Sequence, residues 1–181
     1  MANKAGVVRI TGGDFRGRKI KTPGGNTHPM GERERIALFN MINDRIEGNF
    51  VMDLYCGGGT LGIEALSRGA VMALFIDNDE NAVMTANENL QKLGLYGLAG
   101  GAIVSDIPRT ARTATDRYGI VIADPPYDKY NKKMVEYLPR LVLDGGILVL
   151  SHPGDAPELN GVELVKTRKY AGATISIYEK K

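Results

Sequence analysis

The amino-acid sequence predicts an α/β fold with a central, mostly parallel sheet of seven strands. From about residue 50 onward, short apolar runs alternate with longer segments of helical pattern, which is typical of consecutive right-handed βαβ units. Two β-rich runs at 161–170 and 173–179 are separated by too few residues for a helix, so they predict an antiparallel hairpin at the sheet's edge. Shorter β-like runs at 7–13 and 16–22 predict a small N-terminal hairpin.

The elements of this fold follow in a regular order. After the N-terminal hairpin, a turn-rich linker at 24–31 precedes a helix expected over 32–44, whose apolar side chains would pack on the main domain. Asp79 is suited to cap a later helix and Gly94 to end it. We expect a basic extension at 1–48 and a main domain at 49–181. The parallel strands are expected at 49–55, 72–77, 101–105, 118–123 and 145–150, and the helices between them at 60–69, 79–94, about 107–116 and 130–142.

The composition of the 181 residues, 43% hydrophobic and 24% charged, is that of an ordinary globular domain. No apolar run approaches the roughly 18 to 20 residues that a membrane-spanning helix needs, and the N-terminus lacks the apolar core of a signal peptide. We therefore expect a cytoplasmic protein without membrane contact, and a monomer. With one cysteine, Cys56, and two histidines, His28 and His152, neither a disulfide nor a metal site is expected.

The charges are segregated along the chain. Residues 1–50 hold nine Lys or Arg and five Asp or Glu, residues 51–165 hold nine and fifteen, and residues 166–181 hold five and one. The three segments therefore carry +4, −6 and +4, which sum to the net charge of +2. Two basic ends suit a polyanionic partner such as nucleic acid, although solvated surfaces would explain them equally well.

A glycine-rich turn follows the first strand of the main domain. In the segment VMDLYCGGGTLGIEAL, Gly57, Gly59 and Gly62 form a G-x-G-x-x-G pattern between a strand and a helix. Such glycines permit tight bending and close approach of a ligand to the helix N-terminus, although packing alone could also require them. Asp77 follows Gly57 by twenty residues and ends the next strand, where a carboxylate would meet a ribose diol. A nucleotide-like cofactor is therefore expected.

Asp53 indicates which cofactor this is. A carboxylate four residues before Gly57 would repel a pyrophosphate, but it would attract a ligand that carries an ammonium and a sulfonium group. This favours S-adenosylmethionine over a dinucleotide. Asp106 could accept a hydrogen bond from an adenine amino group, or could only cap the helix that follows it. The other residues expected in the cofactor site are Tyr55, Asn78 and Ile107.

The tetrapeptide DPPY at 124–127 directly follows the apolar run YGIVIA. Its two prolines end the strand and hold the loop rigid. Asp124 can accept a hydrogen bond from an amine, Pro125 offers a free carbonyl, and Tyr127 offers a face on which a base can stack. Alone, the tetrapeptide could be a simple turn. Beside the glycine turn, it indicates a catalytic site of Asp124, Pro125, Pro126 and Tyr127.

The two motifs together carry a resemblance. DLYCGGGTLGIEALSRGA followed by DPPY resembles the Rossmann-like class I S-adenosylmethionine-dependent methyltransferases of exocyclic amino groups, whose signature is [DNS]-P-P-[YFW]. Within them, the chain is similar to the RsmD family of 16S rRNA guanine-N2 methyltransferases nearly end to end, through RITGGDFRGRKIKTP, HPMGERERIALFNMI, ALSRGA and RKYAGATISIYEKK. The resemblance implies methylation of the N2 amine of guanine 966. It also implies ribosomal RNA or the assembling small subunit as the partner.

The basic N-terminal extension is expected to bind the phosphates of the RNA. The residues expected to do so are Arg9, Arg16, Arg18, Lys19, Lys21, Arg33 and Arg35. A solvated hairpin face is the plain alternative. The chain departs from the usual family linker at His28, where an arginine is usual, and at Met30 and Gly31, where two threonines are usual.

Other functions remain open to the sequence. A DNA or other RNA amino-methyltransferase would use the same tetrapeptide, but 181 residues leave no obvious domain for reading a DNA sequence. A catalytically inactive RNA-binding assembly protein on the same fold would not need Asp53, Asp77, Asp106 and Asp124 intact. A dehydrogenase that uses NAD would leave Asp53 and DPPY unexplained.

Overall fold

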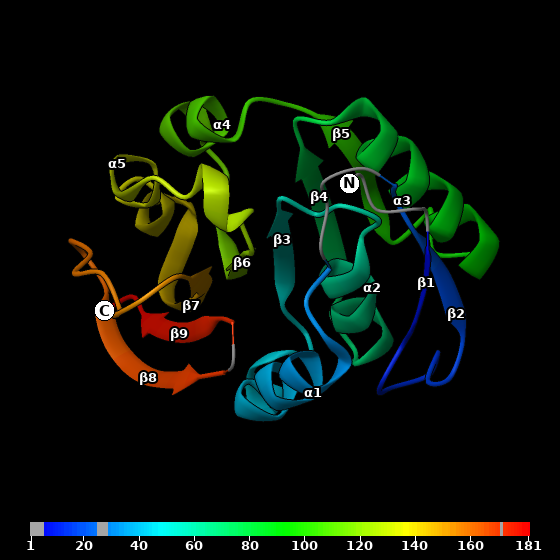
Figure 1. The fold of residues 1–181 in the computed structure, drawn as a ribbon, viewed down its shortest axis with the longest axis horizontal. Coiled ribbons are helices and arrows are strands. Elements are labelled where there is room, and N and C mark those ends of the chain that lie inside the picture. Colours follow the sequence, from blue (N-terminus) through cyan, green and yellow to red (C-terminus); the bar gives the residue numbers. More distant parts are fainter. Residues whose placement is uncertain (1–5, 25–28, 171) are drawn as a thin grey trace.

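A computed structural model describes residues 6–24, 29–170 and 172–181 of the chain. It confirms the predicted sheet of seven strands, in the order β5-β4-β3-β6-β7-β9-β8, and the separate N-terminal hairpin (Figure 1). The strands are β1 Gly6–Arg9, β2 Lys19–Thr22, β3 Phe50–Leu54, β4 Met72–Asp77, β5 Ala99–Val104, β6 Tyr118–Ala123, β7 Val142–His152, β8 Glu163–Lys169 and β9 Thr174–Glu179. The α-helices are α1 Glu32–Met41, α2 Thr60–Ser67, α3 Glu80–Leu93, α4 Ile107–Thr113 and α5 Lys132–Val135, and the 3₁₀ segments are η1 Asn43–Arg45, η2 Tyr127–Lys129 and η3 Leu138–Leu141.

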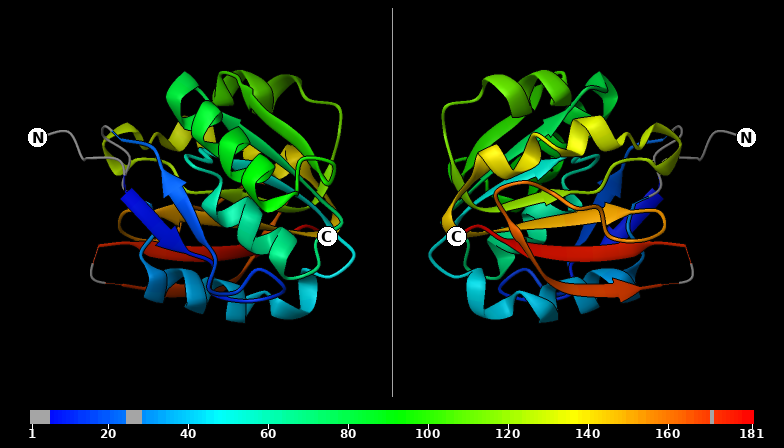
Figure 2. Two further views of the ribbon diagram at one scale, coloured as in Figure 1. Left: turned by 90° about the vertical axis from the view of Figure 1, so that its right-hand side faces the viewer. Right: turned by 90° about the vertical axis from the view of Figure 1, so that its left-hand side faces the viewer.

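Helices cover both faces of the sheet (Figures 1 and 2). On one face, Phe39 of α1 and Leu90 of α3 join Ile177 of β9 in a buried apolar cluster that also includes side chains of α2. On the other face, Ile107 of α4 and Val135 of α5 belong to a second cluster. Because the parallel strands are covered on both sides, they are nearly continuous apolar runs rather than alternating ones.

The C-terminal hairpin closes one side of the sheet, as predicted. β9 runs antiparallel to both β7 and β8, and Thr174 lies opposite His152 on one side and Lys169 on the other. This register places the end of β8 at the same edge of the sheet as the end of β7. Within the described residues, β8 has no strand beyond it.

The prediction of one continuous helix over 130–142 is wrong. The structure has the single turn of α5 and then η3, and β7 begins at Val142 rather than at Gly145. Pro139 lies in the first turn of η3, where its ring and missing N–H prevent an α-helix from running through. The helix expected to reach about residue 116 also ends earlier, because Ala114 has an extended backbone. The departure from the family linker at His28 lies outside the described residues.

A buried charge cluster fastens the N-terminal extension to the main domain. Glu64 on α2 is fully buried and accepts hydrogen bonds from the backbone N–H of Thr11 at 2.9 Å and from its hydroxyl at 2.6 Å. The same carboxylate pairs with Arg68 at 2.9 Å and lies 3.7 Å from Nε of the buried Arg35. One side chain therefore neutralises two cations and holds the segment that follows β1.

We predict that Glu64→Gln destabilises the protein by about 3 to 5 kcal/mol, because it leaves buried guanidinium charge without its partner. The free energy of unfolding in urea measures this. Glu88→Gln is the matched control, since Glu88 pairs with Lys21 at 2.8 Å while both side chains stay half exposed. That change is expected to cost less than about 1 kcal/mol. Equal effects of the two substitutions would contradict the prediction.

Candidate active site

The carboxyl ends of the parallel strands bring the predicted motifs together. β3 lies between β4 and β6, and Leu54 is opposite Ile76 of β4 and Ala123 of β6. The glycine turn follows β3, Asp77 is the last residue of β4, and the DPPY tetrapeptide directly follows β6. Open α/β sheets bind ligands at this edge.

The glycines of the turn meet two different requirements. Gly57 and Gly59 have φ angles of 53° and 80°, a left-handed conformation that favours glycine, and Gly59 is the N-cap of α2. Gly62 faces the ring of Phe75, which an added Cβ would approach to 2.2 Å. The first two glycines therefore let the chain turn, and the third lets α2 pack closely on β4.

Asp53 is a buried carboxylate with one oxygen unused. Its Oδ2 accepts a hydrogen bond from the N–H of Gly62 at 2.8 Å, whereas its buried Oδ1 has no hydrogen-bond partner. Burial raises the pKa of Asp53 to about 8, the bond from Gly62 lowers it, and the charges of Asp124 and Asp77 raise it further. A cationic ligand that brought N–H donors would satisfy Oδ1 and offset the cost of ionisation. Asp53 is therefore suited to an ammonium-bearing cofactor, and its contact with one stays a prediction.

Asp77 supports the other end of the turn. Its Oδ2 accepts a hydrogen bond from the N–H of Gly57 at 2.9 Å, and its Oδ1 accepts one from the N–H of Asp79 at 3.0 Å. Each carboxylate oxygen has a second lone pair, so the expected bond to a ribose diol stays possible beside these contacts. The neighbouring Asn78 is exposed.

Asp106 caps α4, which was the plainer of its two predicted roles. Its Oδ1 accepts a hydrogen bond from the N–H of Arg109 at 2.7 Å. Tyr55 has an unusual φ of 61°, and burial together with the charges of Asp106 and Asp77 raises the pKa of its hydroxyl. The side chain of Ile107 is 1% exposed within the core, and contacts of these three residues with a cofactor stay predictions.

Ser151 joins the two ends of the DPPY tetrapeptide. Its hydroxyl lies 2.8 Å from the hydroxyl of Tyr127, and it also hydrogen-bonds to the carboxylate of Asp124. Burial raises the pKa of Asp124 to about 6, and the bond from Ser151 lowers it. The ring of Tyr127 is 37% exposed, while Pro125 is buried between the two polar residues.

Sequence reasoning missed Ser151, although a signal for it was present. The residue lies one position beyond the strand expected at 145–150. The rule that drew attention to Asp77, a polar residue at the carboxyl end of a parallel strand, applies to it equally.

Six of the seven predicted RNA-binding residues lie on the surface: Arg9, Arg16, Arg18, Lys19, Lys21 and Arg33. The prediction for Arg35 is wrong. Its side chain is 1% exposed, and its guanidinium donates hydrogen bonds to the carbonyls of Arg9 at 2.7 Å and Met30 at 3.0 Å. Arg35 therefore holds α1 against β1 and cannot reach an RNA phosphate.

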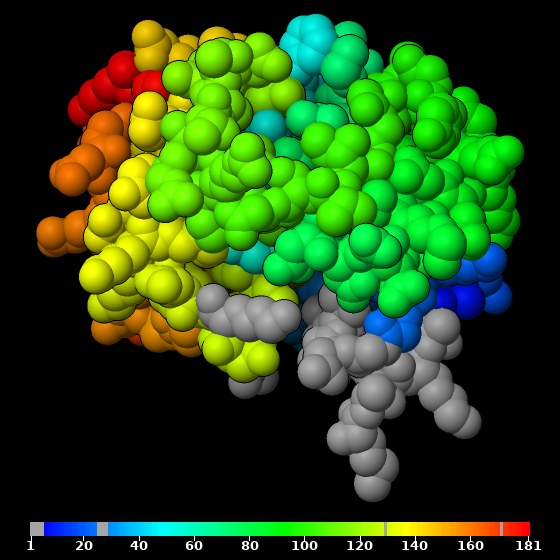
Figure 3. Space-filling model, turned by 90° about the horizontal axis from the view of Figure 1, so that it is seen from above, coloured from blue at the N-terminus to red at the C-terminus, as the bar shows by residue number. Residues whose placement is uncertain are grey.

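Asn89 on α3 ties the hairpin to the glycine turn. This buried side chain accepts a hydrogen bond from the N–H of Lys21 at 2.9 Å and donates to the carbonyls of Lys21 and Gly58, both at 2.8 Å. A Cβ on Gly58 would lie 2.6 Å from the carbonyl of Lys21, so the two backbones are in close contact. The space-filling view shows the hairpin in blue against α3 in green (Figure 3).

The described part of the chain shows no grouping of three or more His, Cys, Asp and Glu side chains that could hold a metal ion. Among the described residues, no helix is long and apolar enough to cross a membrane.

The chain matches one protein-family model over residues 8–179, and the family is described as "Conserved hypothetical protein 95". It is 33% identical to "Putative rRNA methyltransferase YlbH" of Bacillus subtilis (strain 168), over 96% of this chain and 100% of that protein. It is 34% identical to "Ribosomal RNA small subunit methyltransferase D" of Escherichia coli (strain K12), over 80% of this chain and 71% of that protein.

The solved structures agree with this match. "Putative methyltransferase yhhF from Escherichia coli" superposes with a TM-score of 0.87 at 26% identity, over 97% of this chain and 99% of that one. The similarity therefore includes the N-terminal hairpin and α1 as well as the seven-stranded sheet.

We predict that Asp53→Asn stabilises the ligand-free protein, and increasingly so as the pH rises. The pKa of Asp53 is about 8 in the folded protein, against an ordinary value near 3.8, so the folded state retains a proton that the unfolded state has lost. This contribution to stability is therefore lost as the pH rises from about 4 to 8. Asparagine has no such proton and keeps an oxygen for the N–H of Gly62.

Urea unfolding at pH 5 and pH 8 measures the effect. The difference in unfolding free energy between variant and parent is expected to grow by an amount on the order of a few kcal/mol over this interval. A difference that does not change with pH would contradict the raised pKa.

Proposed function

The chain belongs to the RsmD family of methyltransferases, the family whose model matches residues 8–179, and we propose that it methylates the N2 amine of a guanine in small-subunit ribosomal RNA. The observation that carries the proposal is the pairing of two carboxylates at the ends of adjacent strands. Asp53 on β3 has a buried oxygen without a donor, and Asp124 follows β6 beside it with a pKa of about 6. Asp53 suits a cationic methyl donor, and Asp124 suits an amine that must lose a proton.

S-adenosylmethionine is the cofactor, and when bound it supplies a methyl group on a positively charged sulfur. Asp53 would hold its ammonium group through Oδ1, and the glycine turn leaves room for close approach to the start of α2. Asp77 would bind the ribose, with Asp106 and Tyr55 beside the adenine. These are the residues of this chain that hold and orient the donor.

Asp124 acts on the acceptor. A pKa of about 6 leaves its carboxylate mostly ionised at neutral pH, so it can accept a hydrogen bond from the exocyclic amine and take the proton that the amine loses. Ser151 orients this carboxylate and the hydroxyl of Tyr127. The exposed ring of Tyr127 is available to stack on a flipped base, a contact worth roughly 1 to 3 kcal/mol. The two prolines keep these groups in place.

The extension at 1–48 positions the RNA through phosphates. Lys21, whose backbone bonds to Asn89 beside the glycine turn, and Arg33 at the start of α1 are the surface cations that support this. Arg16 and Arg18 lie on the loop between β1 and β2, which packs on Ser67 at the end of α2 away from that turn. The family resemblance points to guanine 966 of 16S rRNA as the target. We propose that the enzyme acts in the cytoplasm as a monomer, on the RNA or on the assembling small subunit.

The proposed function is tested by incubating the protein with labelled S-adenosylmethionine and small-subunit RNA, either naked or in ribosomal particles, and mapping the modified nucleoside. N2-methylguanine is expected. We predict that Asp124→Ala keeps cofactor binding and lowers the rate by about 100- to 10,000-fold, because the proton acceptor is lost. N6-methyladenine as the product, or no transfer to any RNA, would contradict the proposal.

We predict that Ser151→Ala shifts the acid limb of the pH–rate profile to higher pH. The hydroxyl stabilises the charged form of Asp124, so its removal raises a pKa that is already about 6, and activity then falls at a higher pH as acid is added. A shift of up to about one pH unit in kcat/KM is expected. Ser151→Thr retains a hydroxyl and is expected to restore the profile.

Thr167→Ala is the matched control, because it removes a hydroxyl that bonds to Ser176 in the same sheet and does not contact Asp124. If Ser151→Ala lowered activity equally at every pH, Ser151 would support only the fold.

A further inference from the structure

One face of β8 carries basic side chains that no feature of the active site explains. Lys166 lies opposite Ile177 of β9, and Arg168 lies opposite Ile175. Both isoleucines belong to the core cluster that includes α1, and the half-buried Tyr170 packs against the same cluster. Because opposed residues of an antiparallel pair point to the same face, Lys166 and Arg168 lie on the α1 side of the sheet. We call Lys166, Arg168 and Tyr170 the C-terminal stripe.

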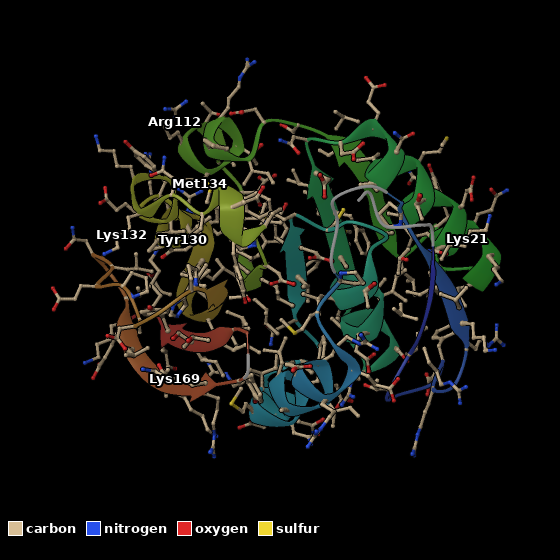
Figure 4. All side chains as sticks on the ribbon, in the orientation of Figure 1. Lys21, Arg112, Tyr130, Lys132, Met134 and Lys169 are labelled. Carbon is tan, nitrogen blue, oxygen red and sulfur yellow. The ribbon has the colours of Figure 1, made fainter. Side chains whose placement is uncertain are left out.

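The charges of the stripe are not neutralised by the protein. Three of the five basic residues at 166–181 form ion pairs: Lys169 with Asp155 at 2.8 Å, Lys180 with Asp144 at 3.8 Å, and Lys181 with Glu163. Lys166 and Arg168 are exposed, and neither forms an ion pair within the described residues. Figure 4 shows the paired Lys169 at the end of β8. The two unpaired cations are therefore both on the α1 side and available to an external anion.

The stripe ends beside the active site. Lys169 and His152 both lie opposite Thr174, so the end of β8 is separated from the end of β7, which carries Ser151, by β9 alone. Two strand spacings make this about 10 Å. In the right-hand view of Figure 2, which looks along the order of the strands, β7 and β8 both end on the side of the molecule where the β1–β2 hairpin lies. In Figure 1, turned by 90° from that view, the hairpin and β8 lie on opposite flanks of the sheet.

We propose that the C-terminal stripe is a second RNA-binding surface, which binds phosphates flanking the target nucleotide on the side of the active site opposite the N-terminal hairpin. This inference rests on the proposed function. Arg168 presents a planar fork of donors that matches phosphate oxygens, and Lys166 adds a point charge. The RNA would then be held at both flanks of the site, with the target base between them.

The test compares two double variants that each remove two positive charges, one variant from β8 and the other from the residues that follow β9. Lys166→Ala/Arg168→Ala removes the stripe's cations, and Lys180→Ala/Lys181→Ala removes two paired lysines beyond the other end of β9. Binding to naked small-subunit ribosomal RNA is measured over a range of salt concentrations. The slope of log affinity against log salt is expected to become shallower by about 1.4 to 1.8 in the stripe variant, which is two lost phosphate contacts. The control variant is expected to keep the parent slope.

Calorimetry with S-adenosylmethionine is expected to give the parent affinity for the stripe variant. Equal slopes of log affinity against log salt for both double variants would overturn the proposal that the stripe binds RNA. If methyl transfer by the parent protein were nevertheless observed, the proposed function would stand. Loss of activity on ribosomal particles with an unchanged slope on naked RNA would assign the stripe to a protein partner and would also overturn the proposal. If the parent protein transferred no methyl group to RNA, the proposed function and the stripe would fall together.

Discussion

Two carboxylates at the ends of adjacent strands hold the turn on which the site depends. Asp53 bonds to the N–H of Gly62 at 2.8 Å, and Asp77 bonds to the N–H of Gly57 at 2.9 Å, so the turn is fastened near its start and at its end. The left-handed backbone of Tyr55, which a non-glycine residue rarely adopts, persists because this frame surrounds it. Burying carboxylates is costly, and the raised pKa of Asp53 measures that cost in the ligand-free protein. A cationic ligand would relieve this cost, so Asp53 is expected to hold its proton until such a ligand binds and to lose it then.

The N-terminal extension is joined to this frame rather than attached loosely to the surface. Asn89 bonds to both backbone groups of Lys21 and to the carbonyl of Gly58, so the hairpin and the glycine turn share one side chain. Glu64 of α2 holds the segment that follows β1 through hydrogen bonds to Thr11. The hairpin is therefore in a fixed position relative to the glycine turn. Methyl transfer from a sulfonium depends on in-line alignment as well as on the proton acceptor, so a rigid connection between the hairpin and the glycine turn would support the proposed reaction.

Much of this architecture follows from local patterns, and the parts that do not follow depend on packing. The parallel strands and the glycine turn were predictable because burial on both faces and left-handed turns restrict the residues that can occur there. The single helix expected over 130–142 failed because Pro139 outweighs the apolar periodicity around it. Arg35 looked like its basic neighbours in sequence, and only the tertiary structure places it beside Glu64 in the interior. Ser151 lies one position past the strand predicted at 145–150 and inside the longer β7, but its link to Asp124 and Tyr127 needs the pairing of β6 with β7.

The segregation of charge along the chain has a physical reason once the fold is known. The acidic middle segment places Asp53, Asp77, Asp106 and Asp124 at one edge of the sheet, where they suit a cationic cofactor and would repel an RNA backbone. Salt screens such charges over about 8 to 10 Å, so cations that offset the repulsion must lie close to the site. Lys21 beside the glycine turn on the hairpin flank and the cations of β8 on the other flank are suited to provide them. An uncharged base, unlike its phosphates, can approach this acidic edge without the penalty, so the electrostatics would favour the proposed flipped base with its phosphates on the two basic flanks.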